Sequence, residues 1–220
     1  MQKSQRTKQL TTMAMMAALA YIVTMVSKGL PPMFLFLRYD PKDIVLAITG
    51  FIYGPFSAFL VSVLVSLIEM FTLSETGVIG FFMNVLASTA LVAPAALIYK
   101  RRRTLKGAVY GLISGILTMT LVMLLWNYII TPIYMGIPRE KVVELLVPAI
   151  LPFNLIKGSI NAALIMIIYK PVVETLRKVH LIPQSHPNTE KAQSRAGILL
   201  VSLLVLATSV LIVMILNGRF

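Results

Sequence analysis

The chain alternates between long apolar stretches and short polar ones. Seven apolar segments are predicted to form helices, at about residues 8–27, 43–54, 55–72, 78–99, 107–134, 147–169 and 196–216. Most of them have the length that a helix needs to cross about 30 Å of hydrocarbon, which is roughly 17–25 residues. The second is shorter and stops at Gly54-Pro55, a pair that interrupts helices. The pattern therefore predicts an all-α integral membrane protein.

Composition strengthens this prediction and excludes several classes of chemistry. Hydrophobic residues make up 58% of the 220 positions and charged residues only 13%, whereas soluble domains carry about 25% charged residues. The lack of cysteine excludes disulfides, cysteine-ligated zinc, iron–sulfur clusters and thiol nucleophiles. Both histidines, His180 and His186, lie in a polar stretch, so we expect no histidine metal cluster and no intramembrane Ser-His-Asp site. The sequence has no P-loop, so the chain is not expected to bind ATP in that manner.

Lysines and arginines are distributed unevenly between alternate loops. One side of the membrane receives thirteen of them and only two glutamates, Glu174 and Glu190. The thirteen are Lys3, Arg6, Lys8, Lys100, Arg101, Arg102, Arg103, Lys106, Lys170, Arg177, Lys178, Lys191 and Arg195. Because cytoplasmic loops carry the excess of Lys and Arg, this side and the amino terminus are predicted to be cytoplasmic. Topology in a cell membrane thus accounts for the net charge of +12 without a nucleic-acid partner.

Amide and amine side chains interrupt three of the predicted spans toward the outer side. Asn84 and Asn127 lie near the outer ends of two helices, and Asn154 and Lys157 share one face of a third. The loop after the first helix lies on the same side and adds further candidates. The candidate binding residues are Leu37, Tyr39, Asp40, Asn84, Asn127, Asn154 and Lys157. We expect these four segments to converge on one ligand site.

Two interpretations of the buried polar residues stay open. A lysine at the centre of a bilayer costs roughly 2.5–3.5 kcal/mol. Lys157 therefore either snorkels to the outer boundary or faces a cavity and meets a ligand or a carboxylate. Asn127 and Asn154 either contact a ligand or form hydrogen bonds between helices, which are worth about 0.6–2 kcal/mol each in a membrane.

The residue types indicate what kind of ligand would fit. An asparagine amide pairs a donor with an acceptor and so matches the imide-like edge of a pyrimidine-type ring. A lysine amine suits carbonyl oxygens, hydroxyls or an anionic group. Neighbours such as Phe153 and Trp126 suit a flat aromatic body. Apolar pockets with a few placed polar groups are typical of small-molecule sites.

Two pairs of small residues predict close contacts between helices. Ala14 and Ala18 form one pair, and Gly111 and Gly115 form the other. Pairs with this spacing let two helices approach closely in a membrane. The residues alone favour packing inside the bundle, with docking on a partner as the alternative.

Four stretches, in order and at family spacing, carry a resemblance to a known family. They are "RYDPKDI", "GFIYGPFSAFLVSVLVSLIE", "TGVIGFFMNVLAS" with "PAALIYKRRRTLKGA", and "WNYIITPIY" with "PFNLIKG". Over about residues 8–175 the chain resembles the riboflavin-specific substrate-binding subunits, or S components, of energy-coupling factor (ECF) transporters. The combination of "YDPKDI" with "PFNLIKG" is the most specific part of this resemblance.

The resemblance implies a six-helix membrane protein without catalytic activity that captures riboflavin from outside. It implies as partners a membrane scaffold subunit and two cytoplasmic ATPases. In the family the outer loop covers the vitamin, and polar residues of later helices hold it. The matching positions here are Asp40, Asn84, Asn127, Asn154 and Lys157. A family surface that meets the scaffold is matched by Ala14 and Ala18 on the first helix.

The end of the chain departs from the family pattern. We expect a substrate-binding membrane domain over residues 1–178, a polar linker over 179–195 and an additional transmembrane helix within 196–220. The expected fold is thus a bundle of six core helices plus a seventh. The resemblance gives no function for the seventh helix.

Other functions stay open at this point. One alternative is that the ligand is another vitamin, such as folate, thiamine or a related flavin. A sensor or scaffold without a small ligand is a second alternative, and an intramembrane enzyme acting on a lipid or isoprenoid is a third. Such an enzyme usually needs Asp, Glu or His at membrane depth, and only Glu69 comes close. We therefore expect no catalytic residue, no resident cofactor and no metal.

Overall fold

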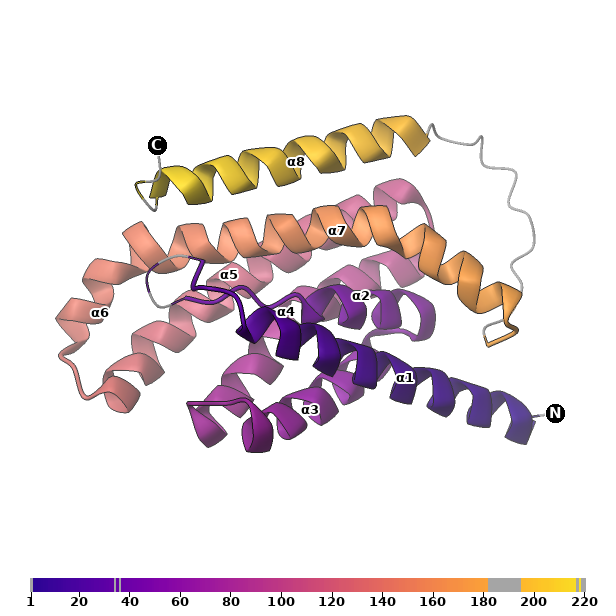
Figure 1. Cartoon of the computed structure of the whole chain (residues 1–220), viewed down its shortest axis with the longest axis horizontal. Helices are drawn as coiled ribbons and strands as arrows, with labels where there is room; N and C mark the ends of the chain where they lie inside the picture. The colour runs from indigo at the N-terminus through magenta and orange to yellow at the C-terminus, as the bar shows by residue number, and fades with distance from the viewer. Residues whose placement is uncertain (1, 34, 36, 182–194, 217, 219–220) are drawn as a thin grey trace.

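The computed structural model describes residues 2–33, 35, 37–181, 195–216 and 218 (Figure 1). Its regular elements are helical, which confirms the all-α prediction. They are α1 (Gln2–Lys28), α2 (Lys42–Tyr53), α3 (Pro55–Thr72), α4 (Gly77–Arg101), α5 (Leu105–Met135), α6 (Arg139–Leu145), the π-helical turn η1 (Leu146–Ile150), α7 (Leu151–Lys178) and α8 (Arg195–Leu216). Most of the predicted linker, residues 182–194, lies outside the described residues.

Six helical segments of the described part are long and apolar enough to cross a membrane, so the chain is a multi-pass membrane protein. They cover Gln5–Lys28, Pro55–Thr72, Gly77–Arg101, Leu105–Met135, Arg139–Lys178 and Gly197–Leu216. α2 is not among them, because its 12 residues extend only about 18 Å at 1.5 Å per residue. Gly54 ends α2 with a φ of 96°, a conformation that favours glycine, and Pro55 opens α3.

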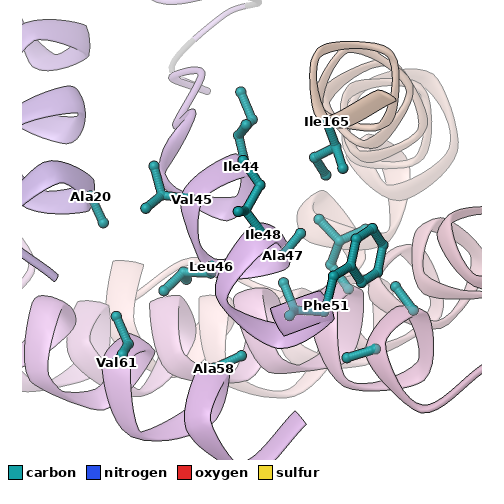
Figure 2. Close-up of a cluster of buried hydrophobic side chains, with 14 of the residues drawn as sticks. Ala20, Ile44, Val45, Leu46, Ala47, Ile48, Phe51, Ala58, Val61 and Ile165 are labelled. Atoms are coloured by element: carbon teal, nitrogen blue, oxygen red, sulfur yellow. The ribbon is translucent and has the colours of Figure 1, made fainter. Parts of the chain in front are cut away.

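The short helix α2 occupies the centre of the bundle. Every residue from Lys42 to Phe51 is buried, whereas a helix at a surface buries only one face. Its neighbours are α1, α3, α4 and α7. Figure 2 shows side chains of α2 directed to different sides of the helix, with Ala20 of α1, Val61 of α3 and Ile165 of α7 around them. This central position brings the polar first turn of α2 into the interior of the protein.

Glycines let α5 pack closely against α4. A side chain at Gly111 would meet the backbone of Ala95, and one at Gly115 would meet the carbonyl oxygen of Leu91. The Gly111 and Gly115 pair therefore serves packing inside the bundle, as small residues at this spacing do in membranes.

The sixth predicted helix extends beyond its hydropathy boundaries at both ends. The sixth helix was predicted from about residue 147, but α6 begins at Arg139, directly after Pro138, and continues through η1 into α7. α7 reaches Lys178 instead of ending near residue 169. Helical hydrogen bonds are local, so polar residues outside the apolar span continue a helix that hydropathy alone ends at the membrane boundary.

The additional helix α8 lies along α7 on the outside of the bundle (Figure 1). Ser202 and Ser209 are its buried residues among those described, each with 5% exposed. They are seven residues apart and therefore share one face, which packs on α7. Its other faces carry exposed apolar side chains, as a helix in contact with lipid does.

Candidate binding site

A cluster of charged side chains lies inside the bundle around the first turn of α2. Lys42, Asp43 and Glu69 have exposed fractions of 1%, 0% and 2%. The side chains of Asp40 and Lys157 are largely covered as well, with 20% and 12% exposed. Burying an isolated charge costs on the order of several kcal/mol, so charges covered to this degree need partners.

Lys42 holds the first half of this cluster. Its Nζ lies 2.8 Å from Oδ2 of Asp40, in the loop after α1. The same nitrogen lies 3.0 and 2.8 Å from the two carboxylate oxygens of Glu69 in α3. Glu69 also accepts a hydrogen bond of 3.0 Å from Nδ2 of Asn84 in α4. Oδ1 of Asp40 accepts one of 3.2 Å from the hydroxyl of Thr24 in α1. Lys42 and its two carboxylate partners thus connect helices α1 to α4 and the loop.

Asp43 holds the second half. Its Oδ2 lies 3.2 Å from Nζ of Lys157 and accepts a hydrogen bond of 3.3 Å from Nδ2 of Asn161, both in α7. The hydroxyl of Ser88 in α4 donates to Oδ1 of Asp43. Oδ1 of Asn161 accepts a hydrogen bond of 2.7 Å from the hydroxyl of Tyr39 in the loop. Tyr39 and Asp40 therefore fasten the loop to both halves of the cluster.

The geometry of a helix explains why two adjacent residues serve different partners. Side chains of consecutive helical residues point about 100° apart. Lys42 accordingly faces α3, while Asp43 faces α4 and α7. Asp43 also lies in the first turn of α2, where the helix dipole stabilises a negative charge.

The loop residues of the cluster have strongly shifted pKa values. Burial by itself would raise the pKa of Asp40, but the ammonium groups of Lys42 and Lys157 and the hydrogen bonds from Lys42 lower it to about 2. Burial, reinforced by the charges of Asp43 and Asp40, raises the pKa of Tyr39. Asp40 is therefore ionised at neutral pH, and Tyr39 is a neutral phenol whose hydroxyl donates a hydrogen bond to Oδ1 of Asn161.

The structure brings four of the seven predicted binding residues into this cluster. They are Tyr39, Asp40, Asn84 and Lys157. Lys157 meets a carboxylate, in agreement with one of the two interpretations of its position. Leu37 is half-buried in the same loop, and its carbonyl oxygen accepts a hydrogen bond of 2.8 Å from the backbone N–H of Met33.

The two remaining candidates hydrogen-bond within their own helices. Nδ2 of Asn127 donates to the carbonyl oxygen of Met123 at 2.8 Å. Nδ2 of Asn154 donates to that of Ile150, also at 2.8 Å. These bonds do not join two helices, as the packing interpretation of the amides required. The role of both residues as ligand contacts stays a prediction.

Sequence reasoning missed four members of the cluster. Lys42 and Asp43, at the end of the outer loop and the start of the second predicted helix, were not among the candidate binding residues, and neither were Ser88 and Asn161. One signal was available, because Asn161 follows Lys157 by four residues and so lies on the same helical face. Glu69 was considered only as an acid–base group for an enzyme, whereas it is the ion-pair partner of Lys42.

Ala14 and Ala18 lie on the outside of the bundle. Both are exposed, while Ala17 and Ala20 of the same helix are buried with 4% and 0% exposed. The pair therefore does not pack inside the described bundle, unlike Gly111 and Gly115. It remains free for contact with lipid or with another protein.

The chain is similar to a family of known membrane proteins. The family model described as "ECF transporter, substrate-specific component" matches residues 8–169. The riboflavin transporter RibU of Staphylococcus aureus is 27% identical over 182 residues, which is 80% of this chain and 95% of that protein. The riboflavin transporter FmnP of Bacillus subtilis is 28% identical over 188 residues, which is 80% of this chain and 99% of that protein.

A solved structure agrees with these matches. It is described as "Structure and mechanism of the S component of a bacterial ECF transporter" and has a TM-score of 0.66 at 26% identity. The similarity covers 78% of this chain and 99% of that one. The resemblance found in the sequence is thereby confirmed. The family match ends at residue 169, so α8 lies outside it.

Proposed function

The chain belongs to the family of substrate-specific components of ECF transporters, and on this premise we propose that it is the subunit that binds riboflavin for uptake. The similarity to two riboflavin transporters over nearly their whole length supports this ligand. The observation that carries the proposal is the buried polar cluster beneath the loop of Tyr39 and Asp40. Such a cluster costs free energy in a membrane protein and typically marks a functional site.

The chemistry of riboflavin fits the candidate residues. The vitamin combines a flat aromatic ring system, an imide edge and a hydroxylated side chain. The amides of Asn84, Asn127 and Asn154 suit the imide edge, because an amide offers a donor beside an acceptor. The amine of Lys157 suits a carbonyl or hydroxyl oxygen of the ligand. In this proposal Leu37, Tyr39 and Asp40 cover the bound vitamin from the loop.

Uptake in this proposal depends on partner subunits. The sequence has no P-loop, so the energy for uptake comes from two cytoplasmic ATPases acting through a membrane scaffold subunit. The exposed Ala14 and Ala18 supply the docking face, because small residues allow close approach of a partner helix. The excess of Lys and Arg on one side supports an amino terminus in the cytoplasm.

The direct test is the visible absorption spectrum of the protein purified in detergent. The polypeptide has no visible chromophore of its own, so flavin bands that persist through purification report a retained ligand. We expect these bands, and we expect titration of the stripped protein with riboflavin to saturate at one ligand per chain. Folate and thiamine serve as competitors in the same titration. A stripped protein that binds folate or thiamine but not riboflavin would contradict the proposal.

Binding of riboflavin is expected to protect the loop from hydrogen exchange. The loop is joined to the bundle through Tyr39 and Asp40, and a ligand beneath it adds contacts and excludes water. The measurement is exchange at residues 37–40 with and without riboflavin, with the turn at Arg102–Thr104 as a reference outside the site. Equal exchange of the loop in both states would argue against a covering role.

A further inference from the structure

The Lys42 ammonium is surrounded by oxygens of protein carboxylates. A lysine ammonium offers three donors. Three oxygens lie within hydrogen-bond distance of Nζ, namely Oδ2 of Asp40 at 2.8 Å and the two oxygens of Glu69 at 3.0 and 2.8 Å. The side chain is only 1% exposed. Lys157 differs, because its Nζ has one carboxylate contact at 3.2 Å and its side chain is 12% exposed. Lys42 therefore has no donor available for a ligand.

The two carboxylates that Lys42 joins belong to different parts of the protein. Asp40 lies in the loop, and the backbone N–H of Lys42 also donates to its Oδ1 at 3.1 Å. Glu69 lies in α3 and holds the amide of Asn84, a candidate ligand contact. Without the ammonium between them, the two carboxylates would repel each other in a medium of low dielectric constant. Lys42 thus cancels the repulsion that would otherwise push Asp40 of the loop away from Glu69.

We propose that Lys42 is a positioning residue for riboflavin capture, which holds the loop closed by joining Asp40 to Glu69 and fixes the amide of Asn84. This inference rests on the proposed function. It makes slow release of riboflavin depend on a residue that does not touch the vitamin. Association is affected less, because changes within one binding site act mostly on the dissociation rate.

The double variant Lys42→Met with Glu69→Gln tests this role. It removes the ammonium together with the more deeply buried of its two carboxylates, and the new amide oxygen can still accept from Asn84. We expect riboflavin to dissociate at least about tenfold faster, with a much smaller change in the association rate. Hydrogen exchange at residues 37–40 in the riboflavin complex is expected to become faster. Both rates can be followed through the change in flavin fluorescence on binding.

A matched control breaks a polar contact at the other end of the bundle. The hydroxyls of Tyr99 and Tyr169 lie 2.9 Å apart, and Tyr169→Phe removes their hydrogen bond. This variant is expected to keep the dissociation rate and the loop exchange of the unmodified protein. Thermal unfolding of all ligand-free variants shows whether stability and release change separately.

Several outcomes would overturn the inference. An unchanged dissociation rate in the double variant would do so, as would faster release with unchanged exchange of the loop, since that pattern indicates a general loosening. If the double variant does not fold, Glu69→Gln alone replaces it, because it weakens the anchor in α3 and leaves Lys42 paired with Asp40. Unchanged release in that variant would also reject the role of Lys42. An unmodified protein that binds no riboflavin would instead overturn the proposed function, and this inference with it.

Discussion

Replacing Ala14 and Ala18 together by tryptophan is expected to abolish riboflavin uptake and to leave riboflavin binding intact. Both alanines are exposed on α1, whose hydrogen bond to the polar cluster comes from the later residue Thr24. A partner helix that docks by close backbone approach is held away by two indole rings. In the proposed function the energy for uptake comes from the partner ATPases, so a chain that does not dock is not expected to take up riboflavin.

Two measurements and one control decide this prediction. Riboflavin titration of the isolated double variant reports binding, and vitamin uptake in cells that supply the scaffold and the ATPases reports transport. Ala207→Trp is the matched control, because Ala207 is exposed on α8, which packs on α7. Normal uptake by the α1 double variant would reject this face as the docking surface. Loss of binding as well as uptake would show that the two alanines support the bundle.

Lys157→Met is expected to weaken riboflavin binding and, in addition, to destabilise the protein. A lost hydrogen bond from a charged group costs about 1.5–3 kcal/mol, which corresponds to roughly a ten- to a hundredfold loss of affinity. The substitution also leaves Asp43, which is 0% exposed, without its cation. Removing one partner of a buried ion pair typically costs about 3–5 kcal/mol of stability.

A second substitution separates these two effects. Asp43→Asn removes the uncompensated charge, so the double variant Lys157→Met with Asp43→Asn is expected to regain most of the lost stability but not the affinity. Thermal unfolding and riboflavin titration measure the two quantities. Lys170→Met, an exposed lysine of the same helix, is the control and should change neither. Unchanged affinity in Lys157→Met would remove Lys157 from the site.

The candidate site was only partly predictable from the sequence. Lys157 and Asn84 were recognised because a polar residue inside an apolar span is costly and therefore noticeable. Lys42 and Asp43 carried no such signal, because charged residues at the start of a helix ordinarily face water. Glu69 was noticed near the end of its span, but its partner could not be named, since Lys42 lies 27 residues away along the chain.

The two pairs of small residues show the same limit of prediction from sequence patterns. Gly111 with Gly115 and Ala14 with Ala18 have one and the same spacing in the sequence. The glycines pack against α4, whereas the alanines are exposed. Spacing shows that two residues share a helical face, but it does not show what that face meets.

The sequence by itself determined the all-α fold, the membrane spans and the family of this protein. These features follow from single segments, because a span needs only enough consecutive apolar residues, and a helix satisfies its own backbone hydrogen bonds in lipid. Only the tertiary structure decided that the short helix α2 lies at the centre and that its first turn joins the loop to α3, α4 and α7. Which charges become partners depends on how each helix is rotated against its neighbours. That rotation results from side-chain packing on all sides of α2 at once, which no single segment of the chain contains.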